Sequence, residues 1–258
     1  EMVRIYNATL DPASVTGKPD GVEGWLPGRT EATGYGVWYA AVKDMERRGL
    51  APDQCTAAIQ GFGKVGMHAA TALHRSGVRI VGLTDLTGGL YDPGGLDTLD
   101  VAAHYARHGS FNGYKARSLT SKRLFGLRVD YLIPAATGHV IHAGNADHVQ
   151  ARVIVEGANM PVTYDAMKIL TEKGVDIIPD IYANAGGVIA SNLEFRQALG
   201  GQKFTRPMTF AHIRERFDAT YDAMKPLMKK GRTMTEASID VALQRIHQTM
   251  TERDLLSR

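Results

Sequence analysis

The sequence has little cysteine, few aromatic residues, no long apolar run and no strong excess of charge of either sign. One of its 258 residues is a cysteine and 7% are aromatic. The single thiol, Cys55, excludes an internal disulfide framework and is typical of a protein in a reducing compartment, so we expect a cytoplasmic protein. The apolar runs are short and interrupted by charged residues, and we therefore expect no membrane-spanning helix.

The charges are nearly balanced, with 30 Lys and Arg against 27 Asp and Glu and a formal net charge of +3. No basic block is present, so nucleic acid is not an expected partner. The histidine pairs His104/His108 and His139/His142 lack a third ligand at metal-binding spacing, and we expect no metal site. A chain of this length with 44% hydrophobic residues suits one large α/β domain or two small ones.

The first half of the chain alternates between helical and strand patterns. Apolar residues recur at helical spacing over Glu31–Gly49, which predicts a helix with Thr30 as its N-cap and a terminal glycine as its stop. A buried strand is predicted at Thr56–Gln60, a helix at Met67–Arg75 and a second strand at Val78–Thr84. The strand–helix–strand unit takes about thirty residues, as a βαβ crossover does.

The alternation continues to residue 180. We predict a turn or hairpin at 88–97, a helix at 96–108, an irregular segment at 109–128, a strand at 129–135, a strand at 152–159, a helix at 161–174 and a strand at 175–180. This order predicts an α/β fold with a doubly wound, mostly parallel, Rossmann-like sheet.

The remainder of the chain is predicted to be helical. Two apolar stripes are expected to pack into the core: the first is Ile213, Phe217, Tyr221, Met224 and Met228, and the second is Ile239, Ala242, Ile246 and Met250.

The stretch "AAIQGFGKVGMHAA" places Gly61, Gly63 and Gly66 between the first predicted strand and its helix. This G-x-G-x-x-G spacing is weak evidence by itself, but its position in a βαβ unit is typical of dinucleotide binding. The first glycine permits the tight turn, the second lets the backbone approach a pyrophosphate, and the third lets the helix pack on the strand. The helix N-terminus also attracts phosphate.

Asp85 ends the next predicted strand, 19 residues after Gly66. Its carboxylate is suited to accept hydrogen bonds from a ribose diol and to repel a 2′-phosphate, which favours NAD, with NADP still possible. Lys64, inside the motif, either neutralises a phosphate or points to solvent, and the sequence leaves both alternatives open.

Three further segments are candidates for ligand contact. "PAATGHV" and "EGANMP" each follow a predicted strand, and ligands bind at the carboxyl ends of strands in open α/β sheets. The backbone at Ala136 and Thr137 is therefore expected near the cofactor, and Asn159 is expected either to bind the nicotinamide side or to satisfy its own turn. In "NAGGVIAS", Gly186 and Gly187 indicate close packing or approach to a ligand, and close packing is slightly favoured.

The chain resembles the cofactor-binding domain of the glutamate, leucine, phenylalanine and valine dehydrogenases, and glutamate dehydrogenase is the most similar member. The resemblance extends over nearly the whole chain. It rests on six motifs in order: "VTGKP", "GRTEATGYGV", "IQGFGKVG", "LIPAAT", "VEGANMPVT" and "NAGGVIASNLEF".

The resemblance implies an NAD(P)-dependent oxidoreductase that deaminates an amino acid, with glutamate as the implied substrate, and that forms a homo-oligomer. The cofactor-binding residues it implies, together with those from the glycine motif, are Arg29, Thr33, Gly61, Phe62, Gly63, Lys64, Val65, Gly66, Asp85, Ala136, Thr137, Asn159 and Asn184. Ser191 matches the serine that holds the distal carboxylate of glutamate.

The chain also departs from the family's pattern. Lys64 replaces the usual asparagine, and Gly138-His139 replace an amide after "PAAT". The family's catalytic lysine and aspartate lie in an N-terminal domain, and no residue here matches them, so catalytic residues stay unassigned.

This sequence begins "EMVRIYNATLDP", without an initiator methionine. We therefore expect residues 1–30 to be a lead-in from a preceding domain, residues 31–205 to form the dinucleotide-binding domain, and residues 206–258 to form helices packed on it. The alternative is a non-catalytic dinucleotide-binding module or regulatory subunit.

Overall fold

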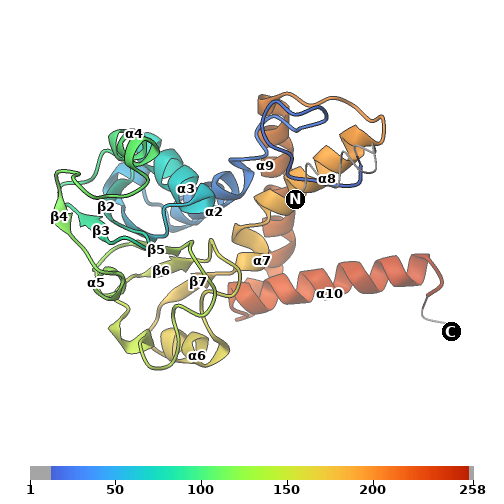
Figure 1. Cartoon of the computed structure of the whole chain (residues 1–258). Helices are drawn as coiled ribbons and strands as arrows, with labels where there is room; N and C mark the ends of the chain where they lie inside the picture. Colours follow the sequence, from blue (N-terminus) through green and yellow to red (C-terminus); the bar gives the residue numbers. More distant parts are fainter. Residues whose placement is uncertain (1–12, 256–258) are drawn as a thin grey trace.

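A twisted sheet organises the computed structural model, which describes residues 13–255 (Figure 1). Within this range the strands form one seven-stranded sheet in the order β4-β3-β2-β1-β5-β6-β7. The strands are β1 (Thr56–Gln60), β2 (Arg79–Thr84), β3 (Gly89–Tyr91), β4 (Arg117–Ser118), β5 (Tyr131–Pro134), β6 (Val153–Val155) and β7 (Asp176–Ile178). The first twelve residues of the expected lead-in and residues 256–258 lie outside the described range.

The sheet is mostly parallel, as the sequence predicts. β1 pairs in parallel with β2 and β5, and β6 and β7 extend the sheet in parallel beyond β5. The edge strands β3 and β4 are antiparallel. The parallel pairing brings the carboxyl ends of β1, β2, β5 and β6 to one edge of the sheet.

Helices cover both faces of the sheet (Figure 1). They are α2 (Ala32–Arg48), α3 (Lys64–Arg75), α4 (Thr98–His108), α5 (Ser121–Phe125), α6 (Tyr164–Glu172), α7 (Asp180–Ala183), α8 (Gly186–Ala198), α9 (Arg206–Met228) and α10 (Met234–Glu252), with short 3₁₀ turns at Pro52–Gln54 and Ala146–His148. Successive strand residues point to opposite faces: Ala57 and Ile59 join the core under α2 and α3, and Ala58 joins the core under α5 and α6.

The glycine turn joins α3 tightly to the end of β1. Gly61 has a positive φ of 94°, and its N–H donates to Thr84 O on β2 at 2.7 Å. A Cβ at Gly66 would overlap the Gly61 carbonyl, so only glycine lets the first turn of α3 approach this closely. The roles predicted for the first and third glycines are thus seen in the backbone geometry.

The sequence predicts the C-terminal end of α2 correctly but not its N-cap. Gly49 ends the helix in the left-handed conformation, as predicted. Thr30 is not the N-cap: the cap position is Glu31, which makes no side-chain capping bond, and the Thr30 hydroxyl donates to Asp20 Oδ1 at 3.0 Å. A competing loop contact therefore takes the hydroxyl that was expected to cap the helix.

The segment 109–128 is not wholly irregular, because it contains β4 and α5. β4 has two residues and α5 has five, which is too short for either period to be visible in the sequence. β4 exists through its pairing with β3, and α5 is capped by the Thr120 hydroxyl, which accepts from Arg123 N.

The two C-terminal apolar stripes differ in their environment. Ile213, Phe217 and Met224 on α9 are buried, as predicted. The second stripe is not in the core: Ile239 is 46% exposed and Ile246 is 56% exposed. The first turns of α10 pack against α9 and β7, and the helix then extends away from the body (Figure 1). Helical periodicity identifies an apolar face but not whether this chain supplies its partner.

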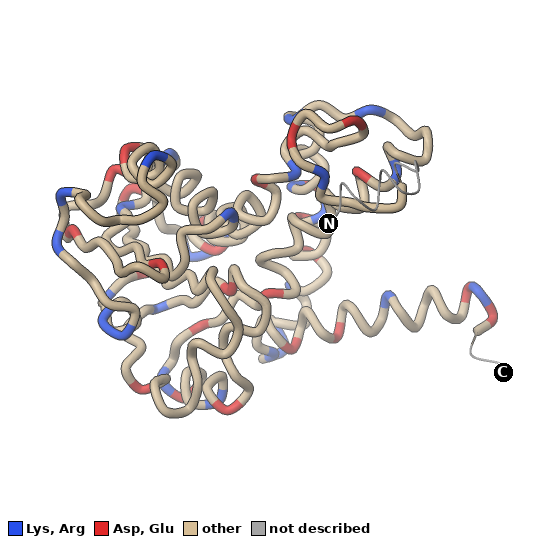
Figure 2. Tube along the Cα trace, in the orientation of Figure 1, with Lys and Arg blue, Asp and Glu red and all other residues tan. Residues whose placement is uncertain are grey.

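Charges are distributed without a dominant patch. Lys and Arg are interspersed with Asp and Glu along most elements (Figure 2). Among residues 13–255, no helix combines the length and the apolar character needed to cross a membrane.

Candidate functional site

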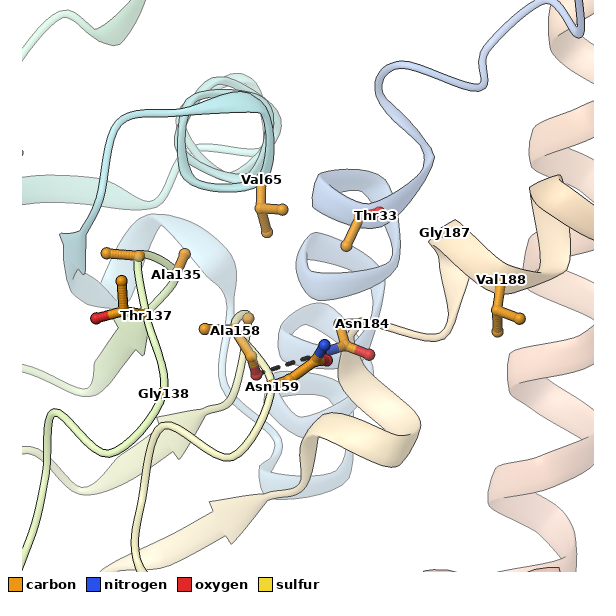
Figure 3. A pocket seen from close by; sticks show the side chains of 12 residues that line it. Thr33, Val65, Ala135, Thr137, Gly138, Ala158, Asn159, Asn184, Gly187 and Val188 are labelled. Carbon is orange, nitrogen blue, oxygen red and sulfur yellow. Dashed lines mark hydrogen bonds between the residues drawn. The ribbon is translucent and has the colours of Figure 1, made fainter. Parts of the chain in front are cut away.

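A cleft of roughly 530 Å³ lies at the carboxyl edge of the sheet (Figure 3). Its walls come from α2, the start of α3, the loops that follow β5 and β6, and the region where α7 meets α8. Six of the predicted cofactor residues line it: Thr33, Val65, Ala136, Thr137, Asn159 and Asn184. Segments far apart in the sequence therefore meet around one hollow because parallel strands end at one edge.

The two asparagines of this cleft are hydrogen-bonded to each other. Asn184 Nδ2 donates to Asn159 Oδ1 at 2.8 Å and to Ala158 O at 3.4 Å, and Figure 3 shows the two side chains pointing toward each other. Asn159 thus does more than satisfy its own turn, since it links the loop after β6 to the end of α7. Both amides retain further hydrogen-bonding capacity for a ligand.

The loops after β5 and β6 are also joined by their backbones. His139 N donates to Met160 O at 2.8 Å. Both residues have left-handed backbones, with φ of 58° at His139 and 44° at Met160. Such conformations are uncommon for residues other than glycine and occur preferentially at functional sites.

The N-terminus of α3 lies beside the cleft and has the features of an anion site. Gly63 is the N-cap residue, and no side chain caps the helix there. A Cβ at Gly63 would meet no atom within 4 Å, so the cap position itself leaves open space beside the helix start. The uncapped N–H groups and the helix dipole favour a phosphate at this position.

Two residues of the glycine motif differ in their side-chain environment. Phe62 is buried, with its ring against Tyr105 and Phe111, so only its backbone faces the turn. Lys64 is exposed at the first position of α3 and forms no ion pair with any residue in the described range. Both alternatives for Lys64, solvation and phosphate contact, therefore fit its position.

One carboxylate oxygen of Asp85 accepts the hydrogen bonds that fold the turn after β2. Its Oδ1 accepts from Thr87 N and Thr87 Oγ1, each at 2.7 Å, and from Gly88 N at 3.0 Å. Its Oδ2 is buried and makes no hydrogen bond of ordinary geometry within residues 13–255, although the Tyr105 hydroxyl interacts with this carboxylate. Asp85 thus folds the turn with one oxygen and keeps acceptor capacity on the other.

Buried acceptors without a hydrogen bond of ordinary geometry concentrate at this edge of the sheet. Within the described residues they include Gln60 Oε1, Thr84 Oγ1, Asp85 Oδ2 and Glu156 Oε1, which lie at the ends of β1, β2 and β6. An unmet buried acceptor costs about 1–3 kcal/mol, and the side-chain oxygens of Gln60 and Thr84 are groups that a polar ligand can satisfy. With the open helix terminus, these groups fit a dinucleotide.

The paired glycines at the start of α8 pack closely against α2. A Cβ at Gly186 would overlap the Ala32 carbonyl, and one at Gly187 would overlap Thr33 Oγ1. The close-packing interpretation of "NAGG" is confirmed, and Gly187 also lines the cleft. Close packing here brings α8 to the cleft wall.

Arg29 and Ser191 lie outside the lining of the cleft, next to a buried glutamate. Arg29 Nε is 3.8 Å from Glu194 Oε2, and the Ser191 hydroxyl donates to Thr16 Oγ1 at 2.8 Å. Glu194 also accepts from Lys18 N at 3.0 Å and pairs with Lys18 Nζ at 3.6 Å. α8 therefore anchors the lead-in segment through hydroxyl and carboxylate contacts.

Sequence reasoning missed Glu194. A glutamate in a helix is ordinarily solvated, and only its spacing of three residues from Ser191 places it on the same face. Its side chain is fully buried, and that of Lys18 is 2% exposed, which no sequence pattern indicates.

The family comparison agrees with this geometry. A model of the glutamate/leucine/phenylalanine/valine dehydrogenases matches residues 24–254. The chain belongs to this family. Over 244 residues it is 39% identical to glutamate dehydrogenase A2 of Halobacterium salinarum, covering 93% of this chain and 58% of that protein. It is 38% identical over 245 residues to the glutamate dehydrogenase of Thermotoga maritima, with the same coverage of 93% and 58%.

Solved structures show the same fold. The leucine-bound form of the hetero-hexameric glutamate dehydrogenase from Thermus thermophilus superposes with a TM-score of 0.85 at 29% identity, covering 97% of this chain and 60% of that chain. The glutamate dehydrogenase of Peptoniphilus asaccharolyticus gives a TM-score of 0.76 at 26% identity, with coverage of 97% and 60%. This chain thus spans about 58% of the length of its curated relatives.

The Glu194 cluster gives a stability prediction. Glu194→Gln keeps the side-chain shape but leaves the Lys18 ammonium buried without its counter-charge, so the free energy of unfolding is expected to fall by about 3 kcal/mol. Urea unfolding measures this change. The matched control is Glu215→Gln on α9, where the side chain is 76% exposed and a change below about 0.5 kcal/mol is expected. Equal losses in the two variants would contradict the buried pairing.

Proposed function

We propose that this chain is the cofactor-binding part of an NAD-dependent glutamate dehydrogenase. The reaction is the reversible oxidative deamination of glutamate to 2-oxoglutarate and ammonia. The observation that carries the proposal is the cleft at the carboxyl edge of the sheet, where the open N-terminus of α3, the Asn159–Asn184 pair and Thr33 meet. Membership of the family supports the reaction class.

Each part of the cleft is assigned one task in this proposal. The N–H groups at the start of α3 bind the pyrophosphate, with Gly63 leaving room for it. Asp85 accepts from the adenosine ribose, and its negative charge disfavours a 2′-phosphate, which favours NAD over NADP. Thr33, Asn159 and Asn184 orient the nicotinamide side.

The bound nicotinamide supplies the hydride acceptor for the substrate α-carbon. The imino acid that results is hydrolysed by water, and this needs groups that transfer protons. We assign none of them to this chain and infer that a further polypeptide segment supplies them. The names of the relatives support glutamate as the substrate, with Ser191 as a carboxylate-binding candidate.

The exposed apolar face of α10 favours the presence of an additional segment that packs against it. Ile239, Leu243 and Ile246 follow helical spacing and are 46%, 58% and 56% exposed. A protruding amphipathic helix of this kind is stabilised when its apolar face is covered. The chain spans 58% of its relatives' length, and the segment that it does not span is the proposed cover. By the same proposal the whole enzyme is an oligomer, like the hetero-hexameric glutamate dehydrogenase of Thermus thermophilus.

A non-catalytic dinucleotide-binding module is the second candidate, because every task assigned to the cleft above concerns binding of the cofactor. The test is a fusion of this chain behind the segment that its relatives carry and it does not span. Glutamate-dependent formation of NADH, followed by absorbance, is expected from the fusion and not from the chain alone. NAD binding without turnover in a folded fusion would favour the module.

Binding of the cofactor has its own prediction. In Gly63→Ala the new methyl group occupies the open space beside the start of α3 without meeting protein atoms. The Kd for NAD is therefore expected to rise about tenfold or more, while the melting temperature stays unchanged. Isothermal titration calorimetry measures the Kd, and NADP is expected to bind the parent chain more weakly than NAD. Gly126→Ala is the control, because Gly126 is exposed, has a negative φ, and its added Cβ would make only ordinary van der Waals contacts at 3.6 and 3.8 Å. Unchanged NAD affinity in the Gly63 variant would contradict the assignment of the phosphate site.

A further inference from the structure

Glu156 is a buried carboxyl group beside the cleft to which the proposed chemistry gives no task. It follows β6 directly and is 1% exposed. Its Oε1 makes no hydrogen bond of ordinary geometry within residues 13–255, although the Val162 amide interacts with the carboxyl group. A carboxylate is expensive to bury in this way, so its presence needs a physical explanation.

Glu156 is joined to a second carboxylate through the backbone. Its Oε2 accepts from Asp180 N at 2.9 Å, at the first residue of α7. The Asp180 side chain in turn accepts from Met160 N at 2.8 Å and from Ile181 N at 2.6 Å. The two carboxyl groups therefore tie together the end of β6, the turn at 157–161 and the start of α7.

The positions of Asn159 and Asn184 in the cleft depend on the connection between Glu156 and Asp180. Asn184 N donates to Asp180 O at 3.0 Å, and Asn159 lies in the turn whose next residue, Met160, is held by the Asp180 side chain. Met160 has the uncommon φ of 44°, which a hydrogen bond from its N–H helps to maintain. A shift of Asp180 relative to Glu156 would thus be transmitted to the Asn159–Asn184 contact.

The electrostatics of the pair oppose full ionisation. Burial raises the pKa of Glu156 to about 7, the Asp180 N–H lowers it, the Asp180 charge raises it, and the Val162 amide lowers it. The group therefore changes charge near neutral pH, with its neutral form favoured on the acid side.

We propose that Glu156 is a positioning residue whose proton occupancy controls how tightly the cleft binds an anionic dinucleotide. This inference rests on the proposed function. With Glu156 neutral, its repulsion of Asp180 is absent and the 157–161 turn and α7 keep the geometry seen here. With Glu156 ionised, two carboxylates repel each other, and the bound pyrophosphate adds further negative charge at the same edge of the sheet.

The sign of the effect follows from linkage. Because the dinucleotide binds better when Glu156 is protonated, binding takes up protons, and affinity falls as the pH rises through about 7. If the bound anion raises the pKa of Glu156 by about one unit, the Kd for NAD rises about tenfold between about pH 6 and about pH 9.

Two histidines near the cleft need to be separated from this effect. His68 on α3 lies near Glu31, Arg206, Asp20 and Lys64, and burial lowers its pKa. His139 lies on the loop after β5. A protonated histidine would also favour an anion at low pH, so the direction of the pH dependence does not identify Glu156 and a variant is required.

Calorimetric titration of the chain with NAD from pH 6 to pH 9, in buffers of different ionisation enthalpy, tests the proposal. The parent chain is expected to take up protons and to lose about tenfold in affinity. Glu156→Gln is expected to bind with the parent's low-pH affinity at every pH, without proton uptake. Glu172→Gln, an exposed position at the end of α6, is expected to behave like the parent. A pH dependence in Glu156→Gln as steep as that of the parent, or no pH dependence in the parent, would overturn the proposal.

Thermal unfolding without cofactor gives an independent readout. The pKa of Glu156 is higher in the folded protein than in the unfolded chain, so protonation of this group favours folding. This contribution to stability is complete below the pKa of the unfolded chain and is lost as the pH rises through about 7. The melting temperature of Glu156→Gln is therefore expected to exceed that of the parent increasingly from about pH 5 to about pH 7, and the difference is expected to level off above that. A constant difference would contradict the titration of Glu156 in the fold.

Two further outcomes are decisive. If Glu156→Gln does not fold, Asp180→Asn removes the neighbouring charge and is expected to move the midpoint of the parent's pH dependence to lower pH; an unmoved midpoint would overturn the proposal. If NAD binds no variant at any pH, the proposed function fails, and the coupling fails with it. NAD binding with the same pH dependence in the parent and in Glu156→Gln would contradict this inference alone and would leave the proposed function intact.

Discussion

The approach of α3 to the end of β1 is the contact on which the candidate site depends. Because Gly66 has no Cβ, the first turn of α3 lies against the Gly61 carbonyl, and Gly61 N is held by Thr84 O on β2. This contact fixes the direction of α3, and with it the position of its uncapped N–H groups relative to the strand ends. Parallel pairing of β1 with β5, and of β5 with β6, then carries the loops that contain Ala136 and Asn159 to the same edge.

This carboxyl edge of the sheet carries buried polar groups that are energetically unfavourable without a ligand. Buried acceptors on Gln60 and Thr84 lack donors within the described part of the chain, and the helix terminus lacks a side-chain cap. A fold can retain such groups when other contacts hold its framework, as the fully buried Glu194 does between α8 and the lead-in segment. The Glu156–Asp180 connection extends this pattern, since a desolvated carboxyl group is retained where it holds the asparagine pair of the cleft.

The sequence was sufficient for features set by local chemistry and strand order. The glycine spacing, the strand before it and the alternation of elements predicted the parallel sheet, and the carboxyl-edge rule placed Thr137 and Asn159 on one cleft. Features set by distant contacts were not visible. Thr30 bonds to Asp20 instead of capping α2, and Glu194 is buried because the lead-in segment covers it. Exposure of Ile246 depends on what packs against α10, and helical spacing carries no information about that partner.

Hydrogen exchange of the chain with and without NAD tests most directly whether the carboxyl edge is the dinucleotide site. Slower amide exchange is expected on adding NAD at 63–66, at 136–138 and at 157–159, the segments that surround the cleft and the start of α3. Unchanged exchange in these three segments would contradict the assignment. So would protection confined to the second cavity, of roughly 620 Å³, lined by α6, β7 and the start of α10.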